Sequence, residues 1–81
     1  MTHPPHWDEE IRVLKTKVAE MVAKGKVPPA GIVGVGVDDT TKRDYFVPRL
    51  QTILDDTRWP ITFRVITVED GMRTTDVKAK P

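Results

Sequence analysis

The sequence predicts a small α/β or α+β protein, a two-layer sandwich with the element order helix, strand, helix, strand, short strand. Apolar residues at helical spacing precede a pair of prolines, two runs rich in β-branched residues flank a second helical segment, and an Asp-Gly pair follows the second run. The chain of 81 residues is long enough for one domain, 1–81, with a single core. A domain of this size buries only about 60% of the surface that its unfolded chain exposes. We therefore expect self-association to supplement its stability.

The first helix is predicted from the segment WDEEIRVLKTKVAEMVAKGK. Its apolar residues recur at spacings of three and four, as one stripe of a helix requires: Trp7, Ile11, Leu14, Val18, Met21 and Val22. Asp8 is a suitable N-cap, and Gly25 stands where a left-handed residue ends many helices. The residues at the start of the chain, 1–7, are expected to form a flexible N-terminal segment.

Two strands are predicted on either side of a second helix. Residues 31–37 alternate valines on one face with an isoleucine and two glycines on the other, and residues 61–68 alternate apolar with polar side chains. Proline is costly inside a helix but suited to its first position, so the intervening helix is expected to begin near Pro48.

The connection between these strands predicts how they pair. It is longer than the dozen or so residues that a parallel crossover needs, which favours a right-handed βαβ unit. An antiparallel pair is the alternative if residues 45–47 form a hairpin with the first strand. The turn at Asp70-Gly71 predicts a short edge strand over 72–77, and the tail 78–81 is expected to fray.

The composition excludes several classes of site and partner. The chain has no cysteine, which removes disulfides, thiolate metal sites and thiol catalysis. It also has no serine, and its two histidines lie near the N-terminus, so no nucleophilic catalytic set is predicted. A net charge of +1 provides no overall field for nucleic acid, and no apolar run approaches the roughly 20 residues that span a membrane. The N-terminus also lacks the pattern of a secretory signal, so we expect a cytoplasmic protein.

The stretch GIVGVGVDD raises the question of why a strand carries so many glycines. They lie inside the apolar run and not at a strand-to-helix turn, and no lysine follows them, so the pattern does not fit a phosphate-binding loop. Two glycines on one strand face indicate close approach by another backbone. Gly34 and Gly36 are therefore predicted to lie against a neighbouring helix or a second copy of the sheet. On this hypothesis Gly36→Val overpacks the contact.

The strand ends provide a candidate metal site. Two acidic residues follow each predicted strand: Asp38, Asp39, Glu69 and Asp70. If the strands are parallel, all four side chains leave the sheet at the edge where open α/β sheets bind ligands. Carboxylate oxygens suit Mg²⁺. The alternative is turn chemistry, because aspartate is favoured in turns for purely local reasons.

Two further clusters have a functional and a structural interpretation. Metal-binding side chains gather near the N-terminus, at His3, His6 and Asp8. A mobile segment makes a weak site, so a solvated tail is preferred. Basic residues near aromatic ones offer a local surface for nucleic acid, at Arg43, Arg49 and Arg58. Aspartates between them dilute the charge, and a solvated helix face with ion pairs is preferred.

The leading functional hypothesis is a non-enzymatic interaction or accessory protein that acts as a homodimer or by binding a protein partner. It follows from the bare strand face, the small core and the lack of a catalytic set. Trp7 and Trp59 are candidate interface or core anchors, because aromatic residues are enriched in both settings. The alternatives are a ligand-binding or Mg²⁺-dependent domain that uses the strand-end carboxylates, and a nucleic-acid-binding protein that uses the basic patch.

Overall fold

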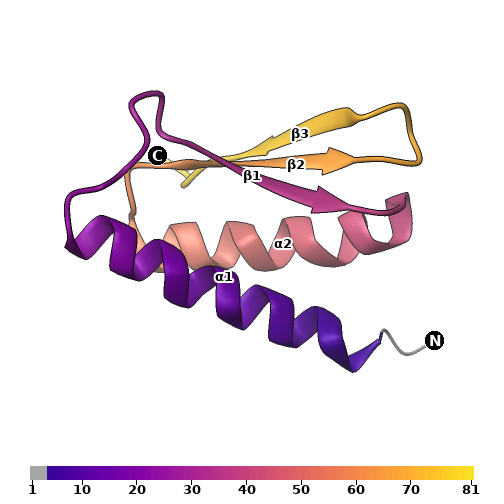
Figure 1. Cartoon of the computed structure of the whole chain (residues 1–81), viewed down its shortest axis with the longest axis horizontal. Helices are drawn as coiled ribbons and strands as arrows, with labels where there is room; N and C mark the ends of the chain where they lie inside the picture. The colour runs from indigo at the N-terminus through magenta and orange to yellow at the C-terminus, as the bar shows by residue number, and fades with distance from the viewer. Residues whose placement is uncertain (1–3) are drawn as a thin grey trace.

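The computed structural model describes residues 4–81, which form the predicted series of helix, strand, helix, strand and short strand (Figure 1). The elements are α1 (Pro5–Ala23), β1 (Ile32–Val37), α2 (Thr40–Thr57), β2 (Thr62–Thr67) and β3 (Arg73–Val77). The sheet order is β1-β2-β3, with β1 parallel to β2 and β2 antiparallel to β3. The predicted right-handed βαβ unit is confirmed, and the antiparallel alternative is wrong because residues 45–47 lie within α2.

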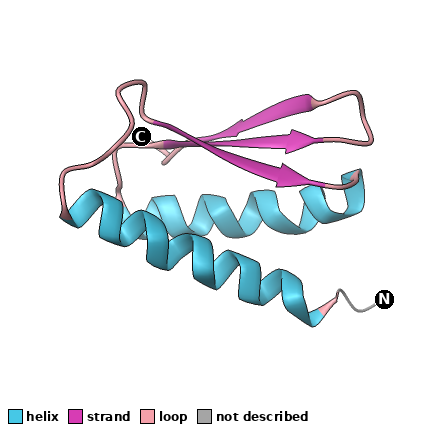
Figure 2. Cartoon of the chain, in the orientation of Figure 1, coloured by secondary structure: helices cyan, strands magenta, loops and turns pink. Residues whose placement is uncertain are grey.

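The molecule has two layers, with both helices on one side of the sheet and no element over the other side (Figure 2). α2 lies close to all three strands, whereas the backbone of α1 lies close to α2 and not to the strands; α1 joins the core through side chains such as Val18. Neither of these helices, within residues 4–81, has the length and apolar character needed to cross a membrane. One face of the sheet is therefore covered by helices and the other is open to solvent.

The strand sequences explain which face of the sheet is covered. Side chains alternate between the two faces of a strand, and in β2 this alternation places Phe63 and Val65 beneath the helices, fully buried. Arg64 and Ile66 point to the open face and are half-buried. From α2, Leu50 and other apolar side chains complete the core. The expected alternation thus directs the apolar half of β2 into a single core.

α1 begins earlier than its sequence predicts. Its N-cap is Pro4, which makes no side-chain capping bond, and Asp8 lies within the first turn instead of at the cap. Residues 5–7 of the segment expected to be flexible thus belong to α1, and residues 1–3 lie outside the described part. The ring of Trp7 lies 5.5 Å from that of Tyr45 in α2, so packing between the helices holds this first turn in place.

α2 also begins earlier than predicted, at Thr40 and not near Pro48. Asp39 caps the helix by accepting a hydrogen bond from the backbone N–H of Lys42 at 2.9 Å. Pro48 lies inside the helix, where proline costs about 3 kcal/mol. The cap supplies about 1 kcal/mol, and burial of Phe46 in the same helical turns supplies a further 2 to 3 kcal/mol. These two gains together offset the proline.

The C-terminal elements are the predicted edge strand and the tail that follows it. The turn between β2 and β3 has left-handed backbone at Gly71 (φ 66°) and at Met72 (φ 61°), and β3 begins one residue later than expected. Residues 78–80 contact α2, and the expectation that the tail frays stays a prediction. The Asp55 carboxylate accepts a hydrogen bond from the backbone N–H of Lys80 at 2.9 Å, and Arg58 donates to the Lys80 carbonyl. The tail therefore lies along α2.

Candidate functional site

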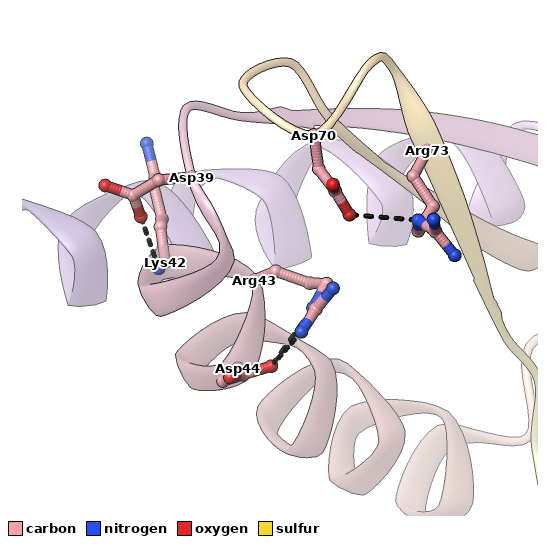
Figure 3. A network of polar contacts seen from close by, with 6 residues as sticks. All are labelled: Asp39, Lys42, Arg43, Asp44, Asp70 and Arg73. Atoms are coloured by element: carbon pink, nitrogen blue, oxygen red, sulfur yellow. Dashed lines mark hydrogen bonds and ion pairs between the residues drawn. The ribbon is translucent and has the colours of Figure 1, made fainter.

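The strand-end residues follow the parallel strands β1 and β2 at the same end of the sheet, and the carboxylates of Asp39 and Asp70 have separate structural roles there (Figure 3). Asp39 caps α2, and Asp70 pairs with Arg73 at 2.9 Å. Asp38 and Glu69 are joined through their backbones: the Glu69 N–H donates to the Asp38 carbonyl at 2.9 Å, which links the loop after β2 to the loop after β1. Within residues 4–81, no group of three acidic or imidazole side chains is placed to hold a metal ion. The turn-chemistry alternative accounts for the one helix cap and the one ion pair observed here.

The three arginines of the expected basic patch make separate contacts on and after α2. Arg43 pairs with its neighbour Asp44 at 2.9 Å, as Figure 3 also shows. Arg49 donates to the Tyr45 carbonyl and its guanidinium lies 3.4 Å from the centre of the Tyr45 ring. Arg58 is the left-handed residue that ends α2 and holds the C-terminal tail. The three side chains therefore belong to three local interactions, and the prediction of a nucleic-acid surface stays untested.

The two tryptophans are placed at the margins of the core. Trp7 packs between the helices against Tyr45 and Phe46, with ring centres 6.4 Å apart in the second pair. Trp59 is partly buried against the core just after α2. Both are consistent with core anchors within the chain, and a role at an interface with another chain stays a prediction.

Gly34 and Gly36 are exposed on the open face of β1. A Cβ atom built on either residue has no other atom within 4 Å among residues 4–81. The expectation that a helix of this chain approaches them too closely for a side chain is therefore wrong: both helices lie on the opposite face of the sheet (Figure 2). The second form of the prediction, a contact with another copy, is a statement about a second chain and stays a prediction.

β1 is an edge strand with an unpaired side. The Thr62 N–H donates to the Gly31 carbonyl at 2.6 Å and the Val68 N–H donates to the Val37 carbonyl at 3.0 Å. A parallel strand bonds a neighbour through alternate residues, so these two bonds set the pattern for the whole strand. The backbone N–H and C=O groups of the odd-numbered residues of β1 point toward β2. The backbone groups of the even-numbered residues point away from the sheet, at Ile32, Gly34 and Gly36.

A groove of ≈ 340 Å³ lies between this unpaired edge and α1. β1 lines it through residues 34–36, and α2 contributes Phe46. α1 contributes one stripe of side chains to the groove: Glu10, Val13, Leu14 and Lys17. Val13 is 38% exposed, which is high for a valine of this chain. The groove is therefore mainly apolar, with a charged residue toward each end.

Sequence analysis did not identify this groove, although one signal for it was present. Val13 is apolar and lies outside the stripe of α1 residues that was predicted to face the core. An apolar residue on the polar side of an amphipathic helix marks a second contact surface. Comparison of the chain with models of protein families, with curated proteins and with solved structures finds no match.

Proposed function

We propose that this chain is a non-enzymatic interaction or accessory protein that binds another protein surface through β1, either in a second copy or in a different partner. The observation that carries the proposal is the state of β1: an edge strand with unpaired backbone groups and two exposed glycines. Unpaired strand edges are templates for pairing with another chain. The cytoplasmic location expected from the sequence stays a prediction.

The two edges of the sheet differ in a way that supports this proposal. Native proteins block unwanted pairing at sheet edges with charged side chains and short strands. β3 has five residues and carries Arg73 and Asp76, whereas β1 has no charged residue. The edge formed by β3 is therefore protected in the usual manner. The edge formed by β1 lacks that protection, which is the expected condition of a binding edge.

The test compares the same charged substitution on each of the two edge strands, β1 and β3. Gly36→Arg places a long charged side chain on β1, and Thr74→Arg places the same side chain on β3, where the residue is also exposed. We expect Gly36→Arg to abolish self-association or to release a co-purifying partner, and Thr74→Arg to leave both intact. Sedimentation from micromolar to millimolar protein measures the first, and affinity purification of the tagged chain measures the second.

The proposal is contradicted if the unmodified protein is monomeric over that range and no protein co-purifies with it in a manner that depends on Gly36. It is also contradicted if both arginine variants lose association equally, because the binding surface would then be the open face as a whole. Circular dichroism of each variant establishes that the fold is retained.

A further inference from the structure

We propose that the groove between α1 and β1 binds a single extended segment of a different protein, which adds to β1 as a fourth strand of the sheet. This inference rests on the proposed function and specifies its partner. The segment has apolar residues at alternate positions, a basic residue toward its N-terminal end and an acidic residue toward its C-terminal end. The argument has four steps: the backbone groups of β1, the cover supplied by α1, the exclusion of a second copy, and the charges at the ends of the groove.

The backbone of β1 selects an extended ligand. Ile32, Gly34 and Gly36 direct their N–H and C=O groups away from β2. Among residues 4–81, none of these three N–H groups donates to a loop or to a helix end. Their spacing of two residues matches the hydrogen-bonding period of another strand. An added strand pairs with all three residues, as in other cases of peptide recognition at a sheet edge.

α1 provides the cover that such a strand needs on one face. Its backbone lies close to α2 and not to the strands, and the groove of ≈ 340 Å³ lies between α1 and β1. Val13 and Leu14 line this groove from α1, and Val35 lines it from β1. An added strand directs every second side chain toward them. Apolar residues at those positions extend the core, and polar residues at the other positions face solvent on the open side of the sheet.

The position of α1 excludes a second copy of this chain as the occupant. Strands lie about 4.8 Å apart and packed helices about 8 to 10 Å apart. α2 lies close to all three strands, and α1 lies beside α2 along the groove that borders β1, from which we infer that α1 lies over the place that a fourth strand would take. If β1 paired with β1 of a second copy about a two-fold axis, the two α1 helices would approach to about 5 Å. That separation is too small for two helices, so the occupant must be a strand that brings no helix to this place.

Charges at the ends of the groove set which end of an antiparallel segment is basic and which is acidic. α1 and β1 run in opposite directions (Figure 1), and Glu10 pairs with Lys42, the third residue of α2, at 2.8 Å. Glu10 therefore lies at the C-terminal end of β1, and Lys17 lies toward the N-terminal end. A segment antiparallel to β1 starts beside Glu10 and ends beside Lys17. A basic first residue shares the Glu10 carboxylate with Lys42, and an acidic last residue complements Lys17.

The probe is a blocked octapeptide with the sequence Lys-Thr-Val-Thr-Val-Thr-Val-Glu, whose valines face α1 in the proposed pose. Amide hydrogen exchange, read by NMR, is the primary measurement. In the free protein, we expect the amides of Val33 and Val35 to be protected by their bonds to β2 and those of Ile32, Gly34 and Gly36 to exchange rapidly. We expect saturating peptide to slow the exchange of these last three amides and so to make protection continuous along β1.

Two altered peptides test the pairing and its direction. Methylation of the threonine backbone nitrogens removes the donors that face β1, and we expect affinity to fall by about tenfold or more. The peptide with lysine and glutamate exchanged has the same composition but opposed end charges, and we expect several-fold weaker binding. Equal affinity of the methylated peptide overturns strand addition, and tighter binding of the exchanged peptide overturns the proposed direction.

Two protein variants test the cover. Val13→Glu places a charge in the groove, whereas Val68→Glu makes the same change at an exposed valine in the turn after β2. We expect peptide affinity to fall by about tenfold for Val13→Glu, because the valine contact is lost, and to stay unchanged for Val68→Glu. Both positions are exposed, so each variant is expected to fold.

Three results overturn the inference. The first is no binding of the probe at millimolar concentration. The second is binding that leaves the amides of Gly34 and Gly36 rapidly exchanging. The third is a homodimer, without peptide, in which those amides are already protected, since the edge then belongs to a second copy. The first two concern this segment alone and leave the sedimentation and co-purification tests of β1 to decide the proposed function. The third supports the proposed function directly, so failure of this inference is distinguishable from failure of that proposal.

Discussion

Replacing Gly36 with valine is expected to stabilise the free protein. The residue is exposed, and a Cβ atom at this position has no other atom within 4 Å. Glycine inside a strand costs about 0.5 to 1 kcal/mol relative to alanine. Gly36 is paired in register with Ile66 on the same face, and an apolar cross-strand pair adds about 0.2 to 1 kcal/mol. The expected gain is therefore about 1 kcal/mol, opposite in sign to the loss predicted from the sequence.

Thermal unfolding followed by circular dichroism measures this gain. For a domain of this size, 1 kcal/mol corresponds to a rise in Tm of about 4 to 8 °C. Gly25→Val is the matched control, because Gly25 also has open space around its Cβ position but has a φ of 67°, which valine rarely adopts. We expect Tm to rise for Gly36→Val and to fall for Gly25→Val.

A lower Tm for Gly36→Val would refute the reasoning, because it would mean that the open face is covered in solution. The dependence on protein concentration then identifies the cover. If the loss appears only at high concentration, the valine disrupts contact between copies. If it appears at every concentration, the backbone of β1 itself does not accept a β-branched residue.

The remaining predictions concern α2, β2 and the strand pair at the open face. Asp39→Ala is expected to cost about 0.5 to 2 kcal/mol through loss of the helix cap, whereas Asp38→Ala, at an exposed residue, leaves urea unfolding unchanged; equal losses would contradict the capping role. Pro48→Ala is expected to raise stability by about 1 to 3 kcal/mol because it restores a donor within the helix, and an unchanged urea midpoint would count against this account of α2. Thr67→Val is expected to stabilise by about 1 kcal/mol, since the buried Thr67 hydroxyl has no hydrogen-bond partner among residues 4–81; a lower Tm would show that the hydroxyl is bonded. The hydrogen bond from Arg64 lowers the pKa of Asp76 below its ordinary value of 3.8, so this pair stabilises the fold above that pH and the contribution is lost as the pH falls through the lowered pKa. Asp76→Asn is therefore expected to flatten acid unfolding below pH 3.8, and an unaltered profile would reject the pair as its source.

The regular elements were predictable because each depends on a short-range pattern. The three-and-four spacing in α1 and the alternation in β2 were sufficient to order the elements along the chain. Their boundaries were less predictable where tertiary contacts outweighed a local rule. Pro48 by itself favours a helix that starts there, but the Asp39 cap and the burial of Phe46 extend the helix toward its N-terminus.

The candidate site was only partly predictable for a different reason. The pattern of β1 identified two glycines on one face, which the structure places on the open side. The groove depends on how far α1 lies to the side of β1, and that displacement is set by the packing of Trp7 and other α1 side chains against α2. No spacing within one element encodes such a displacement, so Val13 could be recognised only as an apolar residue in an unexpected place.

The two pairings of the central strand differ in how much chain separates the partners, and this difference bears on the order of folding. Arg64 pairs with Asp76 across a short hairpin, whereas Ile32 pairs with Thr62 only after the whole of α2 has been traversed. Closing a longer loop costs more chain entropy, and hairpins form within about 1 to 10 μs. We expect β2 and β3 to pair first and β1 to join them last, after α2 has shortened the connection. Destabilising α2 at its cap would then slow folding, whereas changes in β1 would mainly speed unfolding.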